Sequence, residues 1–306
     1  MDIEVRPLAE SDLDAADAIF RDAFGTFLGA DIFGDTDLLR TRFRAGHVAA
    51  LGAYDGGELV GSNLASRWGD VAYFGPLSVT PRLWDAGVGS ALVGATMEVF
   101  ADWGATHQGL FTFAHSPKHH GLYQKFGFWP RFLTAIMSRP VAGDEPASGA
   151  LLSAVADRAA AVGACAELTG AILPGLDLRG EIDSVLDQKL GDVVLVGDPA
   201  EPRAFAVCHG GAGSEAGTGV TYVKVAAVRP GPGAPDAFAA LLAAVTGHAA
   251  SSGAQRVALG VNTARHDAYR HLLAAGFRTD LPGVTMHRPN APGYDRAEVY
   301  LLDDWR

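Results

Sequence analysis

The stretch from Val79 to Gly104 reads VTPRLWDAGVGSALVGATMEVFADWG. A strand-like end and a proline lead into a loop with glycines at Gly87 and Gly89, after which apolar residues recur at the three-to-four spacing of a helix. A helix N-terminus presents about four unpaired N–H groups and roughly half a positive charge, which suits a phosphate, and glycine lets a ligand approach the backbone. The stretch predicts an anion-binding helix start, although a plain capping turn gives the same pattern.

The composition is that of a globular protein with more than one domain. Of 306 residues, 48% are hydrophobic and 19% are charged, so a large core is expected. No apolar run reaches the roughly 18 to 20 residues that span a bilayer, and the N-terminus MDIEVRPLAESDLD is acidic where a signal peptide is basic. Cys165 and Cys208 have neither metal-ligand nor disulfide-framework spacing. We expect a cytoplasmic protein with reduced thiols and no membrane partner.

The charge of the chain argues against polyanionic partners. The net charge is −11, which repels nucleic acid at long range. One segment differs, because no acidic residue lies between Asp102 and Asp144. Its basic and histidine residues include Lys118, Lys125, Arg131, Arg139, His115, His119 and His120. An anionic ligand would be tolerated there, but a mostly buried segment would also carry few acidic residues.

The chain contains two copies of one plan. A shift that places Val79 on Val228 also places Gly127 on Gly276, with no gap between them. Single matches of small residues are weak evidence in an alanine-rich chain, whereas an unbroken register is stronger. We predict two domains of similar fold, residues 1–140 and 151–306, joined by a linker at 141–150 with the sequence VAGDEPASGA.

Each copy is expected to run strand, loop, helix, strand, helix, strand. The predicted strands include VAYFGPLSV, GLFTFA, TYVKVAAV and RVALGV, and DGG in AYDGGEL predicts a hairpin turn. Short helices are expected to begin at the N-caps Ser116 and Thr263 and to be followed by the left-handed residues Gly127 and Gly276. The ending YLLDDWR is interpreted as an edge strand and tail.

This order of elements, with the glycine loop and LYQKFGF at 122–128, resembles the GNAT superfamily of N-acetyltransferases in a tandem arrangement. The resemblance implies an α/β (α+β) fold in which each domain has a mixed, mainly antiparallel central sheet flanked by helices. In that family a Gln/Arg-x-x-Gly-x-Gly/Ala loop binds the pyrophosphate of acetyl-CoA through backbone N–H groups. Here Trp84 stands where glutamine or arginine is expected.

The resemblance also implies which residues bind acetyl-CoA. The strand backbone would pair with the acetyl carbonyl and the pantetheine amides, a form of strand addition. The implied cofactor-binding residues are Leu77, Ser78, Val79, Trp84, Asp85, Ala86, Gly87, Val88, Gly89 and Ser90.

The second copy is predicted to lack this site. In the register of the repeat, Gly89 aligns with Phe238 and Gly87 aligns with Asp236, so bulk and negative charge stand where a pyrophosphate would lie. We therefore expect one acyl-CoA site, in the first domain, and a degenerate second domain that shapes the acceptor pocket.

The expected reaction is direct attack of a small-molecule amine on the thioester. An alkyl amine with a pKa of about 10.4 is mostly protonated at pH 7 and needs a general base, whereas a thiol with a pKa of about 8.5 leaves more easily. The resemblance implies Tyr123 as the general acid near the sulfur; a plain core aromatic is the alternative. His115 is the candidate base, because histidine most often plays this role. Asp70 and Tyr73 flank the same position.

Other interpretations fit the same residues. Trp84 in the loop is compatible with a non-catalytic acyl-CoA-binding or interaction protein. Tandem members of the family include mycothiol synthases, so an acceptor of that kind is another possibility. His115 and His119 are four residues apart, but zinc needs three or four ligands and no cysteine or carboxylate lies nearby, so no metal is expected.

Overall fold

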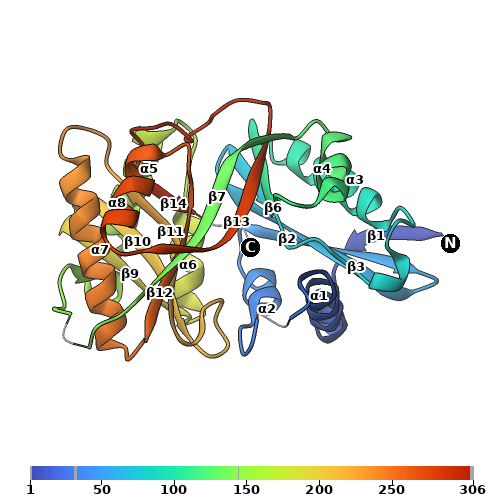
Figure 1. The fold of residues 1–306 in the computed structure, drawn as a ribbon, viewed down its shortest axis with the longest axis horizontal. Helices are drawn as coiled ribbons and strands as arrows, with labels where there is room; N and C mark the ends of the chain where they lie inside the picture. The colour runs from blue at the N-terminus through green and yellow to red at the C-terminus, as the bar shows by residue number, and fades with distance from the viewer. Residues whose placement is uncertain (1, 31–32, 144, 304–306) are drawn as a thin grey trace.

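One mixed sheet of 14 strands runs through the computed structural model, which describes residues 2–30, 33–143 and 145–303 (Figure 1). The strands are β1 (Ile3–Pro7), β2 (Val48–Asp55), β3 (Glu58–Trp68), β4 (Val71–Phe74), β5 (Ser78–Val79), β6 (His107–Phe113), β7 (Trp129–Pro140), β8 (Ala150–Leu151), β9 (Gly191–Asp198), β10 (Glu201–Gly211), β11 (Gly217–Val228), β12 (Arg256–Asn262), β13 (Arg278–Arg288) and β14 (Leu301–Asp303). Their order is β1-β2-β3-β4-β6-β13-β7-β12-β11-β10-β9-β8, with β5 beside β3 and β14 beside β11. Only β4–β6 and β11–β12 pair in parallel, which confirms the predicted mixed, mainly antiparallel sheet.

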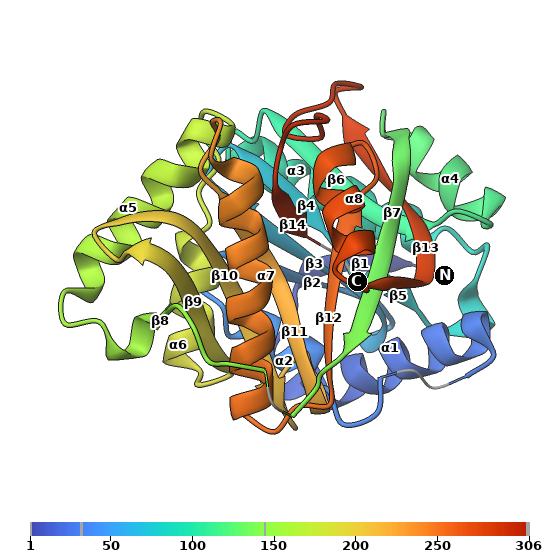
Figure 2. The same ribbon diagram turned by 60° about the vertical axis from the view of Figure 1, so that its left-hand side comes forward.

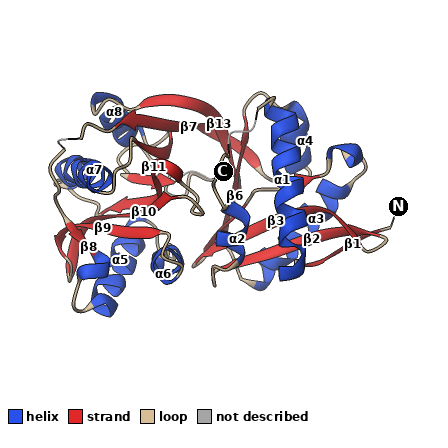
Figure 3. Cartoon of the chain, turned by 90° about the horizontal axis from the view of Figure 1, so that it is seen from below, coloured by secondary structure: helices blue, strands red, loops and turns tan. Residues whose placement is uncertain are grey.

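Helices cover both faces of this sheet (Figure 3). They are α1 (Leu13–Leu28), α2 (Leu38–Phe43), α3 (Val88–Asp102), α4 (Pro117–Gln124), α5 (Arg158–Ile172), α6 (Arg179–Asp187), α7 (Ala234–Ser251) and α8 (His266–Ala274), with short 3-10 turns at Glu10–Asp12, Pro81–Leu83 and Leu152–Ala154. Of the apolar positions whose spacing predicts α3, Val88 and Leu92 are buried, whereas Ala95, Val99 and Trp103 are only partly buried. The rest of the buried face consists of Val93, Thr96 and Phe100. No described helix has the length and apolar character needed to cross a bilayer.

The last strands of the two copies are exchanged, which the sequence analysis did not predict. Strand β13 of the second copy pairs with β6 of the first, where Gly283 lies opposite Phe113, and strand β7 of the first copy pairs with β12 of the second, where Ser138 lies opposite Ala258. The two strands also pair with each other and run side by side at the centre of the molecule (Figures 1 and 2). Each half of the sheet is therefore completed by the other half's strand.

The local turn predictions are mostly confirmed. Gly56 and Gly57 connect β2 and β3 with φ values of 59° and 89°, as the predicted hairpin requires. The Ser116 side chain accepts a hydrogen bond from the His119 N–H and caps α4, and Gly127 adopts a left-handed conformation with φ of 83°.

The prediction that Thr263 caps the next helix is wrong. Helix α8 begins at His266 with Arg265 at its N-cap. Thr263 is used elsewhere, because its hydroxyl donates to the carbonyl of Leu133 on the exchanged strand β7 at 2.9 Å. Gly276 follows α8 with φ of 90°, as predicted.

The sheet opens where β4 ends. Strands β4 and β6 pair as far as Phe74 and Leu110, and the chain then moves away so that β5 pairs only with β3. In the second copy the corresponding parallel pairing of β11 with β12 ends at Val223 and Leu259. A V-shaped opening between two parallel strands therefore occurs once in each copy.

Candidate active site

A cavity of about 1070 Å³ lies at the opening in the first copy, between α1, the start of α3, α4 and the exchanged strand β13. Most of the sequence-predicted site residues line it. Those lining residues are Leu77, Val79, Trp84, Asp85, Gly87, Val88, Gly89, Ser90 and Tyr123. Three predicted residues, Ser78, Ala86 and His115, are not among the described lining residues.

The glycine loop leaves the start of α3 open toward the cavity. Gly87 is the N-cap with φ of 91°, and none of the described side chains caps the helix. A Cβ added at Gly89 would lie 3.5 Å from Leu122, so the space beside the first turn is narrow but free. Left-handed backbone at Gly87 and the absence of a side chain at Gly89 together give an anion direct access to the N–H groups of the turn.

Trp84 holds the loop against the strand. Its indole N–H donates to the carbonyl of Val79 at 2.8 Å, and Lys118 lies over its ring at 5.5 Å. Lys118 also pairs with Asp85 at 2.8 Å. The residue that departs from the family pattern therefore has a structural role here, and Lys118 brings positive charge to the glycine loop.

The basic residues of the segment between Asp102 and Asp144 fall into two groups in the structure. Lys118 and Lys125 line the cavity. Arg131 instead donates to Asn290 at 2.8 Å, and Arg139 pairs with Glu145 and the carbonyl of Ala275. Of these four basic residues, only Lys118 and Lys125 are placed to meet a ligand in the cavity.

Strand β5 pairs with β3 along one edge, and its other edge faces the opening, where the carbonyl of Val79 already accepts from the Trp84 indole. Thr80 N–H donates to the carbonyl of Val60 on β3 at 3.0 Å. Because backbone groups of successive residues point to opposite edges of a strand, the N–H of Val79 points away from β3 and into the opening. This is the edge at which strand addition is expected.

In the second copy the same edge is occupied by the chain itself. Strand β14 enters the opening and pairs with β11, so that Leu302 lies opposite Ala226. The N–H of Val228, which aligns with Val79, donates to the carbonyl of Tyr300 at 3.0 Å. The predicted strand in YLLDDWR is confirmed for 301–303, but it lies inside the opening rather than at an edge of the sheet, while 304–306 fall outside the described residues.

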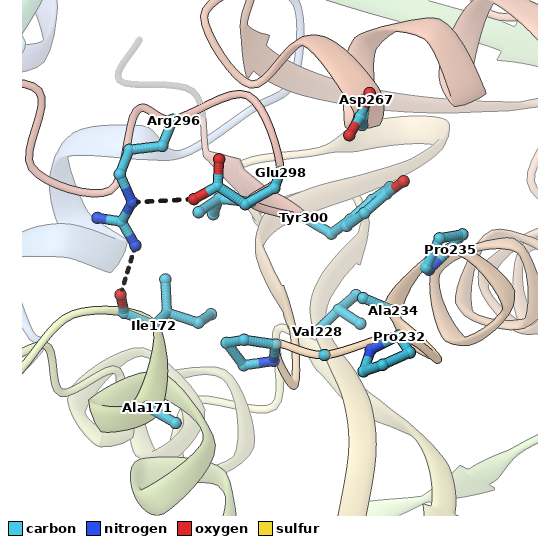
Figure 4. Close-up of a pocket in the computed structure, with 13 residues that line it drawn as sticks. Ala171, Ile172, Val228, Pro232, Ala234, Pro235, Asp267, Arg296, Glu298 and Tyr300 are labelled. Carbon is cyan, nitrogen blue, oxygen red and sulfur yellow. Dashed lines mark hydrogen bonds and ion pairs between the residues drawn. The ribbon is translucent and has the colours of Figure 1, made fainter.

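A smaller pocket of about 370 Å³ is left beside this strand (Figure 4). It is lined by Pro232 in the loop before α7, by Pro235 in the first turn of α7, and by Tyr300 and the ion pair of Arg296 with Glu298. The buried ring of Phe238 lies 5.0 Å from that of Tyr300. Aromatic rings thus pack where the first copy has its glycine loop.

Tyr123 is buried at the wall of the cavity. Its ring lies 5.7 Å from Phe74 in an edge contact, and burial raises the pKa of its hydroxyl well above 10. The hydroxyl therefore stays protonated at neutral pH, which is the state that a proton donor requires.

The two histidines near Tyr123, His115 and His119, lie in different environments. His115 is exposed and stacks on Phe27 at 5.5 Å. His119 lines the cavity 6.5 Å from the Tyr123 ring, and burial together with Lys118 lowers its pKa to about 4, so it is neutral at pH 7. No group of three or more potential metal ligands is formed by the described residues.

Sequence reasoning missed two sets of lining residues. Phe24, Phe27 and Phe33 come from α1 and the segment after it, and the second copy supplies Arg256, Asp280 and Leu281 through β12 and β13. The phenylalanine spacing in FRDAFGTFL was the available signal for the first set. The second set depends on the strand exchange.

The chain was compared with known proteins. Residues 15–128 match the family model described as the acetyltransferase (GNAT) family. None of the curated proteins matches the chain. A proposed acetyltransferase from Pyrococcus horikoshii is 14% identical with a TM-score of 0.70, covering 99% of this chain and 95% of that one. A GCN5-related N-acetyltransferase from Sphaerobacter thermophilus is 19% identical with a TM-score of 0.61, covering 94% and 95%. At these identities the likeness concerns the fold.

Residues 15–128 thus resemble the acetyltransferase (GNAT) family, and the whole chain shares its fold with the two solved structures. The class of activity that the family match supports is acyl transfer.

Proposed function

We propose that this protein is an acetyl-CoA-dependent N-acetyltransferase that acts on the amine of a small molecule. The supporting observation is that an open glycine-loop helix start, the free N–H of Val79 and Tyr123 all lie at one cavity. Phosphate at Gly87–Ser90 and pantetheine along β5 would bring the thioester to the end of the opening beside Tyr123.

In the proposed mechanism the neutral amine attacks the thioester carbonyl, the carbon–sulfur bond breaks, and Tyr123 donates its proton to the departing thiolate. His119 is our candidate to accept the proton from nitrogen, because it lines the cavity; His115 is the second candidate. A histidine with a pKa of about 4 is a poor base for a free ammonium ion. It suits the tetrahedral adduct better, because the nitrogen there becomes more acidic as the bond forms.

We propose that residues 1–140 form the catalytic domain, that 141–150 link it to the rest, and that 151–306 form a degenerate domain without acyl-CoA. The supporting observation is that β14 and the buried ring of Phe238 occupy the second opening. In this proposal the second half closes the acceptor side through β13. The net charge of −11 and the two free cysteines fit a cytoplasmic enzyme without a nucleic-acid or membrane partner.

Calorimetric titration of acetyl-CoA into the wild-type protein and into Gly89→Phe tests this proposal. The substitution copies the second copy's residue into the first loop. We expect one site per chain in the wild type and none in the variant, with Gly89→Ala as the control for folding, because the added Cβ meets only ordinary contacts.

Release of free thiol is then measured with a panel of amines. Binding without thiol release from any amine would favour a non-catalytic acyl-CoA-binding protein. A complete lack of acetyl-CoA binding would refute the proposed function.

A further inference from the structure

The cavity has a wall of aromatic rings on the side away from the glycine loop. We define the aromatic wall as Phe24, Phe27, Phe33 and Phe113, all of which line the cavity. The ring of Phe27 lies 4.9 Å from that of Phe113, and the ring of Phe24 lies 5.6 Å from Phe33 and 6.2 Å from Phe113. The four rings therefore form one continuous apolar surface contributed by α1, the segment after it and β6.

This wall begins beside the groups assigned to the chemistry. The ring of Phe27 lies 5.1 Å from His119, and the ring of His119 lies 6.5 Å from Tyr123. A molecule whose amine reaches the thioester near Tyr123 would place its next few atoms against Phe27 and Phe113.

Phe27 is not needed to build the core. Phe20, two turns earlier on the same helix, is fully buried, whereas Phe27 is only half-buried and belongs to none of the buried hydrophobic clusters among the described residues. Its ring contacts are with Phe113, His115 and His119. A large apolar side chain that faces a cavity rather than the core points to a ligand that covers it.

The charged lining residues from the second copy do not favour a substituent of either sign. Asp280 on β13 and Arg256 on β12 both line the cavity, and their charges are of opposite sign. The α1 residues of the lining, Ala23, Phe24, Phe27 and Leu28, offer no side-chain hydrogen bond to a polyhydroxylated acceptor. A polar molecule placed there would lose its hydration without compensation.

We propose that the acceptor is a primary amine carrying an aromatic or compact apolar group, with that group packed on the aromatic wall and the amine beside His119 and Tyr123. This inference rests on the proposed function and specifies its substrate class. Phe27 is the specificity-determining residue in this arrangement.

The test measures thiol release at saturating acetyl-CoA with 2-phenylethylamine, hexylamine, ethanolamine and glucosamine. Burial of a phenyl group on the wall is expected to give 2-phenylethylamine a kcat/KM at least about 30-fold above that of ethanolamine. Phe27→Ala should raise the KM for 2-phenylethylamine about tenfold and raise the KM for ethanolamine much less, because ethanolamine has no apolar group to pack on the ring. Phe27→Leu should retain part of the preference.

Phe132→Ala is the matched control, because Phe132 is 61% exposed and is not among the described lining residues. Equal or better use of ethanolamine or glucosamine, or an unchanged KM for 2-phenylethylamine in Phe27→Ala, would overturn this inference and leave the proposed function standing. Turnover of ethanolamine or glucosamine but of neither apolar amine would also overturn this inference alone. A protein that binds no acetyl-CoA would overturn both.

Discussion

Arg42 Nη2 lies 2.8 Å from Glu215 Oε2, and both side chains are only 2% exposed although they come from opposite halves of the chain. Arg42 also donates to the carbonyl of Gly75 at 3.0 Å, at the point where β4 ends and the cavity begins. Lys224 pairs with the other oxygen of Glu215. Glu215 of the second half thus holds Arg42, and Arg42 binds the backbone at the opening of the first half.

Glu215→Gln should destabilise the protein strongly, because it removes the buried carboxylate that Arg42 and Lys224 share and leaves Lys224 with Glu181 as its charged partner among the described residues. We expect the free energy of unfolding to fall by about 3 to 5 kcal/mol in urea denaturation. Glu58→Gln is the control, since its pair with Arg82 is exposed and should contribute less than about 1 kcal/mol. Equal effects of the two substitutions would contradict the assigned importance of the buried pair.

Tyr123→Phe should slow acetyl transfer without abolishing it. The thiol product leaves with moderate ease, so loss of the proton donor is expected to reduce kcat about tenfold while the KM for acetyl-CoA stays the same. Steady-state kinetics with the best amine of the panel would measure this. A kcat equal to that of the wild type would remove Tyr123 from the mechanism.

Leu302→Ala should destabilise the folded protein without creating a second acetyl-CoA site. Leu302 is 1% exposed in β14, so its truncation is expected to lower the free energy of unfolding by about 2 to 5 kcal/mol. Calorimetry should still give one acetyl-CoA per chain, because Phe238 remains in the second loop. A stoichiometry of two would show that β14 alone excludes the ligand.

The protein should lose stability as the pH falls from about 6.5 to about 4. Burial lowers the pKa of His107 and of His209 to about 4 and that of His287 to about 3. Their folded-state pKa values lie below the unfolded value, so in this window the unfolded state binds more protons and acid favours it. Burial raises the pKa of Asp295 to about 7 and also raises the pKa of Asp183, which acts in the opposite direction, but the lowered pKa values of these three histidines and of His119 outweigh the two carboxyls.

Urea denaturation at pH 7 and pH 5 checks this dependence. His209 is fully buried, and its protonation alone accounts for up to about 3 kcal/mol across the whole window. His209→Gln should therefore have a smaller difference between the two pH values than the wild type. A difference as large in the variant as in the wild type would exclude His209 as a contributor.

Local features of this fold could be predicted because short stretches determine them. Gly87 and Gly89 mark the helix start, and Ser116 followed by proline marks the next one. The second copy could be recognised because its sequence aligns with that of the first copy in one unbroken register. The exchange of β7 and β13 could not be predicted, since both strands carry a similar continuous buried run and either could pair beside β6.

In the candidate site, too, the residues set by a short stretch of sequence could be predicted, and those set by distant pairing could not. Residues contiguous with the glycine loop were identified correctly as lining the cavity, with the exception of Ala86. His119 and Phe27 were missed as site residues, because helix periodicity does not say which face of a helix meets a cavity. Asp280 was beyond reach, because its position depends on a strand pairing between distant parts of the chain.

The exchanged strands also bear on how the protein is made. Strand β6 ends at Phe113, yet the partner on its open side, β13, begins only at Arg278. During synthesis the first half therefore leaves the ribosome with an unpaired sheet edge, a surface prone to association with other chains. A gene cut at the linker would separate each half from the strand that completes its sheet in the intact chain.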